Sequence, residues 1–535
     1  MRLFIICLSS AIRASMDTRN LLLLFAAGAC LSACTVGPDY KTPATPVPKA
    51  FVAASAIAPE TAETGKPANP PIDLANWWHS FNDPELDSLV KRAIEASLDI
   101  EIALTRLQEA RTAEAVVFGE ALPFGDFSAS AAKGTGTNST RGRVAPPLNA
   151  ATNTTGLKEI THVVGFDAAW DLDIFGRYRR AIEAAKYDTQ AAAEARNAVL
   201  VAVVADVVQS YMDLRGLQMR LAVARQNVEL ARRTLDVVQT RFNRGLTNEL
   251  DLALAQRQYA TLRANLAPLQ AQSNVAQYAI AVLLGKYPEE LNSELATPGV
   301  IPPLPQEIEA GLPLDLLRRR PDIREAERQL AAETARIGVA TADLFPRLTL
   351  TGGAGFQGQG LGKNPVTNSF IWSLGPSAYW PFLDFGTLDA LVDIQDLRTH
   401  ERLVGYKQTV LAAVESVDSA IANYRAQADR LLRLGDALVA SQRAVTLASE
   451  RYERGLTDFL NVLDAQRQEY DLEDQYAVAQ QAAADQFVAL YKGLGGGWEQ
   501  FQTTPPIRQP QPAILAAFRR LLAPSQDGDR PAPAK

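Results

Sequence analysis

Hydrophobic residues follow two kinds of spacing along the chain, and each kind occurs twice. Between Gly176 and Gly245, and again between Gly386 and Gly455, they recur at intervals of three and four, and proline is absent. This spacing predicts helices, each on the order of 100 Å long at about 1.5 Å per residue. The stripe toward the end of the first helix is Leu221, Ala224, Val228, Ala231, Leu235, Val238 and Phe242; in the second it is Leu431, Leu434, Leu438, Ser441, Val445, Ala448 and Tyr452. Such a heptad stripe is typical of coiled-coil packing.

The spacing changes to strict alternation before each long helix, which predicts two pairs of strands of about ten residues each. Pro376 interrupts the last strand and weakens its hydrogen-bond ladder. In the first half the apolar positions are Phe127, Ala129 and Ala131, then Val164, Phe166, Ala168, Trp170 and Leu172. In the second half they are Leu348, Leu350, Ala354 and Phe356, then Phe370, Trp372, Leu374, Ala378 and Trp380.

One stretch of the chain is present twice, without a gap, at an offset of 210 residues. RFNRGLTNELDLALAQRQ begins at Arg241, and RYERGLTDFLNVLDAQRQ begins at Arg451. A glycine between two helical patterns, followed by Thr and then Asn or Asp, predicts a tight helix–turn–helix tip. The return helices are expected over Thr247–Leu284 and Thr457–Tyr491. Two copies of one supersecondary unit indicate packing around a pseudo-axis.

The predicted strands place aromatic and aliphatic residues on one face and small polar residues on the other. A strand of a membrane β-barrel needs this pattern, although the inner face of a soluble sandwich looks similar. Four strands cannot close on themselves, and a bilayer tolerates no open edge. Strands in the membrane therefore require an oligomer, and a trimer would supply 12 strands.

The N-terminal residues resemble a targeting segment. From Met16, which is a candidate for the true start, an Arg-containing region precedes a short apolar run and small residues. Leu31–Cys34 resembles a lipobox, in which Cys34 is lipidated and becomes the mature N-terminus; an ordinary signal peptide with an incidental Cys is the alternative. The other two Cys, Cys7 and Cys30, precede Cys34. The mature fold is therefore expected to contain no disulfide.

Charge and motifs argue against several function classes. The 53 basic and 60 acidic residues give a net charge of −7, which does not suggest a nucleic-acid partner. No HExxH motif, Ser/His/Asp order or clustered carboxylate pair is present, so no catalytic or metal residue is predicted. Gly493–Gly497 follows a helix, and we interpret it as a helix stop instead of a phosphate loop. The chain is expected to be neither an enzyme nor a holder of a cofactor, apart from covalent lipid.

Several motifs in order resemble one family. They are CTVGPDYKTP from Cys34, the Trp77-Trp78 segment with Asp83 and Pro84 as a helix start, the doubled tip, and LPLDLLRRRPDIREAERQLAAETARIGVATADLFPRLTLTGGAGF over Leu312–Phe356. Together they are similar to the outer membrane factor family, the TolC/OprM/NodT-type ducts of tripartite efflux pumps. The resemblance implies a homotrimer with a 12-stranded β-barrel in the outer membrane and a periplasmic α-helical barrel of coiled-coil hairpins.

The resemblance also implies roles at the tips. Docking of a periplasmic adaptor protein carries over to Arg244, Gly245, Leu246, Thr247, Arg454, Gly455, Leu456 and Thr457. The alternative is that these residues only form a good turn. A channel gate carries over to Leu460 and Asp464, which lie four apart on one helix face. Threefold symmetry would make Asp464 a ring of carboxylates, whereas the alternative is a solvated surface Asp. The first half has Leu254 at the position of Asp464.

The expected organisation is therefore a mixed α and β membrane protein with two internal repeats. We expect a signal peptide (1–33), a lipidated flexible tether (34–75), a first repeat (76–285), a linker (286–312), a second repeat (313–498) and a flexible tail (499–535). The expected function is a passive outer-membrane exit duct that an inner-membrane pump of the RND type drives through the adaptor to expel small toxic molecules. A duct for type I protein secretion and a non-conducting periplasmic scaffold lipoprotein are the alternatives.

Overall fold

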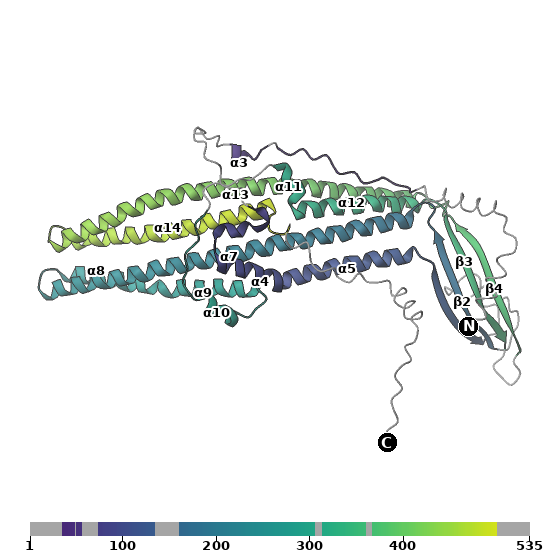
Figure 1. The fold of residues 1–535 in the computed structure, drawn as a ribbon, viewed down its shortest axis with the longest axis horizontal. Coiled ribbons are helices and arrows are strands. Elements are labelled where there is room, and N and C mark those ends of the chain that lie inside the picture. The colour runs from purple at the N-terminus through teal and green to yellow at the C-terminus, as the bar shows by residue number, and fades with distance from the viewer. Residues whose placement is uncertain are drawn as a thin grey trace, which may run out of the picture.

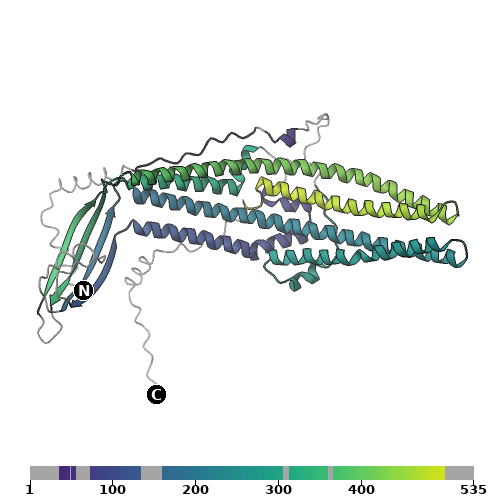
Figure 2. The same ribbon diagram turned by 180° about the vertical axis from the view of Figure 1, so that it is seen from behind.

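The computed structural model describes residues 35–48, 50–55, 73–133, 160–304, 313–359 and 366–499. The predicted signal peptide, Cys34 and the tail beyond residue 499 lie outside these ranges. The chain is elongated, with a β-sheet at one end and two helical hairpin tips at the other (Figure 1). The view from behind shows the two hairpins side by side along the rod (Figure 2).

The two longest helices, α7 (Arg177–Asn243) and α13 (Thr387–Glu453), have 67 residues each. The predicted apolar stripe of α7 is confirmed by burial. Its members Leu221, Ala224, Ala231 and Val238 are buried, while Val228, Leu235 and Phe242 are half-buried. On α13 Val445 and Tyr452 are buried and the other stripe positions are half-buried. No helix in the described ranges is long and apolar enough to cross a membrane.

The return helices differ from the prediction in the first half only. The second is one helix, α14 (Phe459–Leu494), whereas the first is divided into α8 (Glu249–Ala264) and α9 (Leu266–Leu283). Pro268 explains the division, because it cannot donate to the carbonyl of Ala264 and its ring crowds that carbonyl. The helical region that starts at Pro84 is also divided.

That second division lies at Ser97. Its backbone is extended (φ −63°, ψ 128°) and separates α4 (Pro84–Ala96) from α5 (Leu98–Glu120). Serine is favoured at helix N-caps, although the Ser97 side chain makes no capping hydrogen bond here. The predicted start of α4 is confirmed, since Asp83 accepts from the backbone N–H of Glu85 and Pro84 is the first helical residue.

The four predicted strands are confirmed and form one antiparallel sheet in the order β1-β2-β3-β4. Aromatic residues cover one face. The ring centres of Phe127 on β1 and Phe166 on β2 lie 5.1 Å apart, and those of Phe356 on β3 and Phe370 on β4 lie 5.4 Å apart. Within the described residues, no strand pairs with the outer edge of β1 or of β4. The strands are β1 (Phe124–Lys133), β2 (Ile160–Leu172), β3 (Arg347–Gln359) and β4 (Val366–Tyr379).

The sheet leaves its aromatic face uncovered. Phe166 is 66% exposed and Trp372 is 72% exposed, although both are large and apolar. Pro376 lies in β4 opposite Leu350, on an outer strand, where the missing N–H costs least.

The largest apolar core lies midway along the rod. It is built from the tandem tryptophans of the 3₁₀-helix η1 (Leu74–Phe81) and the end of α14. Trp77 stacks on Tyr491 with ring centres 5.5 Å apart, and Phe81 meets Phe487 edge to face at 5.1 Å. The glycine run then ends α14 as predicted, with Gly495 in the left-handed conformation.

Three shorter helices pack beside the long ones, and one of them lies in the predicted linker. They are α10 (Pro288–Leu295), α11 (Pro313–Arg319) and α12 (Pro321–Ala342). In α10, Leu291 and Leu295 are buried against the main core. The described part of the predicted linker, residues 286–304, is therefore packed against the body.

The described part of the predicted tether, residues 35–48 and 50–55 (the leader), is extended, but it is packed along the helices instead of free. It runs along α12 and α13 toward the short helix α3 (Val52–Ser55), as Figure 1 shows. Phe51 is 1% exposed within the main core, and the N–H of Ala53 donates to Asp418 at 3.0 Å. The buried Phe51 ring and the hydrogen bond from Ala53 therefore hold this part of the chain in place, although its composition alone suggests a flexible segment.

Candidate functional site

The first hairpin tip is a Schellman turn. The N–H of Gly245 donates to the carbonyl of Phe242, and the N–H of Leu246 donates to the carbonyl of Arg241, both at 2.9 Å. Gly245 has φ +70°, which a residue with a side chain rarely adopts. A Cβ there would meet no atom within 4 Å, so the backbone angle alone requires the glycine.

The second tip repeats this turn. Gly455 has φ +73° and donates to Tyr452, while Leu456 donates to Arg451, again at 2.9 Å. The predicted helix–turn–helix tips are thus confirmed in their backbone geometry.

The two return helices start differently. In the first, the Asn248 side chain caps the helix by accepting from the N–H of Asp251 at 2.9 Å, and the Thr247 hydroxyl donates to the Asp251 carboxylate. In the second, Asn461 donates to the Thr457 hydroxyl at 2.7 Å, and the helix has no side-chain cap.

Four leucines at the tips are exposed, although the same residue type is buried elsewhere on these helices. Leu246 and Leu250 are 62% and 65% exposed, and Leu456 and Leu460 are 64% and 62% exposed. Exposed apolar side chains gathered at one end of a molecule indicate a contact surface. Arg244 and Arg454 are exposed beside them.

The candidate gate residues lie on one face of α14, as their spacing predicts. Leu460 and Asp464 are both exposed, and the Asp464 carboxylate accepts from the Gln468 amide at 3.0 Å. In the first hairpin the equivalent of Asp464 is Leu254, which is half-buried against the cluster between the tips. The two tips therefore differ in charge at this position.

Sequence reasoning missed the joint between the tips. The Arg241 guanidinium lies 4.8 Å from the centre of the Tyr452 ring, and it donates to the carbonyl of Glu453 at 3.1 Å. Beneath this contact is a small buried cluster: Val238, Ala255, Tyr452, Phe459, Val462 and Leu463. The doubled Arg-aromatic dipeptide was the available signal, because neither residue is needed for a Schellman turn.

A polar seam links α7 to α14 above the tips. Five residues of α7, at intervals of seven, each form a side-chain hydrogen bond or ion pair with α14. This spacing places all five on one edge of α7. The pairs are Asp206–Lys492 (2.9 Å), Asp213–Gln481 (2.6 Å), Arg220–Asp474 (2.7 Å), Asn227–Glu473 (2.6 Å) and Thr234–Gln466 (3.1 Å). The two hairpins of the chain are thus joined by hydrogen bonds and ion pairs as well as by packing.

The seam also contains a carboxyl without a cationic partner. Burial raises the pKa of Asp485 to about 7, and the nearby Asp213 carboxylate contributes to the rise. Burial likewise raises the pKa of Asp213, while the bond from Gln481 opposes that effect. One oxygen of Asp485 is buried and accepts no hydrogen bond from the described part of the chain.

The leader is seated at the sheet end of the helices. Arg180, which is 4% exposed, donates to the carbonyls of Val36 and Gly37 and pairs with Asp39 at 2.7 Å. A Cβ on Gly37 would overlap the backbone of Gly338. The structure thus fixes residues directly after Cys34 at the junction of sheet and helices.

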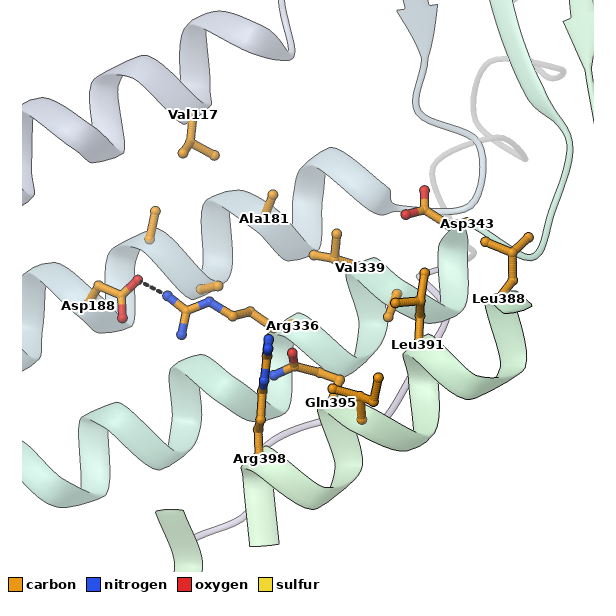
Figure 3. A pocket seen from close by; sticks show the side chains of 14 residues that line it. Val117, Ala181, Asp188, Arg336, Val339, Asp343, Leu388, Leu391, Gln395 and Arg398 are labelled. Atoms are coloured by element: carbon orange, nitrogen blue, oxygen red, sulfur yellow. Dashed lines mark hydrogen bonds and ion pairs between the residues drawn. The ribbon is translucent and has the colours of Figure 1, made fainter. Parts of the chain in front are cut away.

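A cavity of about 510 Å³ lies near the same junction, between α5, α7, α12 and α13 (Figure 3). Its walls are mostly aliphatic, including Val117, Val339 and Leu391, and Arg336 pairs with Asp188 at one side. No nucleophile lies beside a base in this lining. Nor do the described residues contain a cluster of three His, Cys, Asp or Glu that could hold a metal.

Comparisons with known proteins agree with this geometry. The family model described as outer membrane efflux protein matches residues 89–286 and 312–496. Nodulation protein T of Rhizobium leguminosarum bv. trifolii is 30% identical, over 88% of this chain and 95% of that protein. Toluene efflux pump outer membrane protein TtgF of Pseudomonas putida is 28% identical, over 90% and 98%.

A solved structure of the outer-membrane channel OprN superposes with a TM-score of 0.76 at 36% identity, covering 87% of this chain and 100% of that one. The chain belongs to the outer membrane efflux protein family, and the membership that its motifs predict is confirmed. Its relatives are channel proteins and not enzymes.

The carboxyl in the seam generates a prediction about pH. Because Asp485 holds its proton more tightly when folded, the folded state is favoured at low pH, and this contribution is lost as pH rises from about 4 toward about 7. Asp485→Asn stays neutral, so it should match the wild type near pH 4 and unfold ~1–3 °C higher at pH 8. Thermal unfolding followed by circular dichroism in detergent measures this. Asp236→Asn, an exposed site on α7, is the control; equal pH dependence in wild type and Asp485→Asn contradicts the assignment.

Proposed function

We propose that this chain is the outer-membrane exit duct of a tripartite efflux pump, and that it acts as a homotrimer. The observation that carries the proposal is the sheet, whose aromatic face is exposed and whose two edge strands are unpaired within the described residues. In water the exposed aromatic face of such a sheet would be unfavourable. In lipid the unpaired N–H and C=O groups of its edge strands would be unfavourable. Pairing β4 of one copy with β1 of the next removes both edges.

Three copies would close a barrel of 12 strands. The same closure would bring α13 of one copy beside α5 of the next, because α5, α7, α12 and α13 lie side by side in that order. The long helices would then form the wall of a tube that continues the barrel into the periplasm. Passage through this tube needs no chemistry from the chain, and the pump would supply the energy.

The tip would close the tube. Leu460 and Asp464 are exposed on one helix face, and threefold symmetry would gather three leucines and three carboxylates around the axis. Carboxylate rings attract cations and exclude anions, and apolar constrictions resist wetting. Only the second hairpin would supply the ring, because Leu254 replaces the acid in the first.

The exposed tip leucines would receive the periplasmic adaptor. Leu246 and Leu456 are held outward by identical turns, with Arg244 and Arg454 beside them to supply directional donors. Gly245 and Gly455 leave the backbone open, so an adaptor can approach the turn closely. Thr247 and Thr457 complete this surface.

Lipid on Cys34 would anchor the chain beside the barrel. The Arg180 seat holds residues 36–39 at the sheet end of the rod, which is where a membrane leaflet would lie if the sheet spans it. An acyl chain at Cys34 would therefore reach lipid without unseating the leader. A relative named for toluene efflux favours small toxic molecules as cargo, expelled by a pump of the RND type.

The gate generates a prediction about conductance. Replacing Leu460 by Ser together with Asp464 by Asn should raise single-channel conductance severalfold in planar bilayers, because both the apolar and the charged constriction are removed. Asp464→Asn alone should reduce cation preference, seen as a smaller reversal potential in a KCl gradient. Leu250→Ser, the equivalent exposed leucine without an acid, is the control and should change neither. A protein that never conducts in any variant would instead be a periplasmic scaffold.

Lipidation has its own test. Cells labelled with tagged palmitate should yield labelled wild-type protein and labelled Cys30→Ala protein, but no label in Cys34→Ala. Persistent label in the Cys34 variant would show that the lipobox interpretation is wrong.

A further inference from the structure

Each hairpin tip carries an arginine followed directly by an aromatic residue, Arg241-Phe242 in the first and Arg451-Tyr452 in the second. Within the chain only half of this pattern is used, since Arg241 lies on the Tyr452 ring and donates to the carbonyl of Glu453. The reciprocal contact, between Arg451 and Phe242, does not form within the chain. Arg451 is exposed and makes no side-chain hydrogen bond or ion pair with the described residues.

Arg451 and the Phe242-Asn243 dipeptide contain the same interacting groups as the joint between Arg241, Tyr452 and Glu453: a guanidinium, an aromatic ring and a backbone carbonyl. At the offset of 210, Phe242 corresponds to Tyr452 and Asn243 corresponds to Glu453. A guanidinium can bind the face of either a phenylalanine or a tyrosine ring. The acceptor in the formed joint is a backbone carbonyl, so exchanging Glu for Asn preserves it.

This inference rests on the proposed trimer. In a closed ring of three copies the two hairpins alternate, so the second hairpin of each copy meets the first hairpin of the next. We propose that Arg451 lies on Phe242 of the next copy and donates to its Asn243 carbonyl. Six arginine–aromatic contacts then encircle the tip, three within chains and three between them.

The joints between copies depend more on the arginine than the joints within chains. The apolar cluster under Arg241 includes Phe459 and Leu463. Their equivalents in the first hairpin are Glu249 and Ala253, which supply far less apolar surface. Removing the arginine therefore leaves a packed cluster within the chain, but little contact between copies.

Cross-linking tests which residues meet. The full-length trimer carrying Arg451→Cys and Asn243→Cys should form covalent dimers and trimers with a short bifunctional maleimide on a denaturing gel. Arg241→Cys with Glu453→Cys, the matched pair at the formed joint, should give only internally linked single chains. Each single cysteine variant should give no link.

Stability of the assembly tests the arginine itself. Arg451→Gln should lower the temperature at which the trimer dissociates in detergent by several degrees, whereas Arg454→Gln, an exposed tip arginine one turn away with no ring contact, should not. Equal dissociation temperatures in these two variants would overturn the inference. So would a double variant, Arg451→Cys with Asn243→Cys, that is trimeric by native mass spectrometry but gives no link between copies. A wild-type protein that is not trimeric would overturn the proposed function as well.

Discussion

The strand edge is the constraint on which the rest of this architecture depends. In the proposed duct the exposed aromatic face of the sheet would lie in lipid, and lipid provides no hydrogen-bond partner for an unpaired edge. A single chain supplies four strands and leaves two edges. In the proposed trimer, pairing with further copies removes both edges, and the same closure would bring the helices that adjoin the strands into a ring.

In the proposed trimer the helices would continue the barrel as a long tube, and its far end would carry two different kinds of hairpin tip. Both hairpins have the same 67-residue outer helix and the same glycine turn, so they reach the same length. The return helix is divided in the first hairpin only. At the tips the side chains also differ, with Asp464 in place of Leu254, and Phe459 and Leu463 in place of Glu249 and Ala253. Duplication thus provides the frame, and divergence of a few residues between the copies provides the candidate gate and two kinds of joint.

Much of the fold could be predicted because it depends on spacing. The strands, the long helices, the Asp83 cap and the two tips all follow from period, turn chemistry and capping. The divided helices at Ser97 and Pro268 were within reach of the same rules but were outweighed by apolar periodicity. Contacts between distant segments could not be predicted, because nothing local places Arg180 against the leader or Arg241 against Tyr452. The leader illustrates this limit, since its composition suggests freedom while Phe51 is buried in the core.

The most direct test of the account asks whether the aromatic face of the sheet meets lipid. Full-length protein that retains a single tryptophan, either Trp372 or Trp77, can be reconstituted into vesicles of ordinary or brominated phosphatidylcholine. Trp372 is 72% exposed on the sheet and Trp77 is 1% exposed in the helical core. The account predicts strong quenching of Trp372 fluorescence by brominated chains and none of Trp77. Equal fluorescence of Trp372 in both lipids would contradict a membrane-spanning sheet.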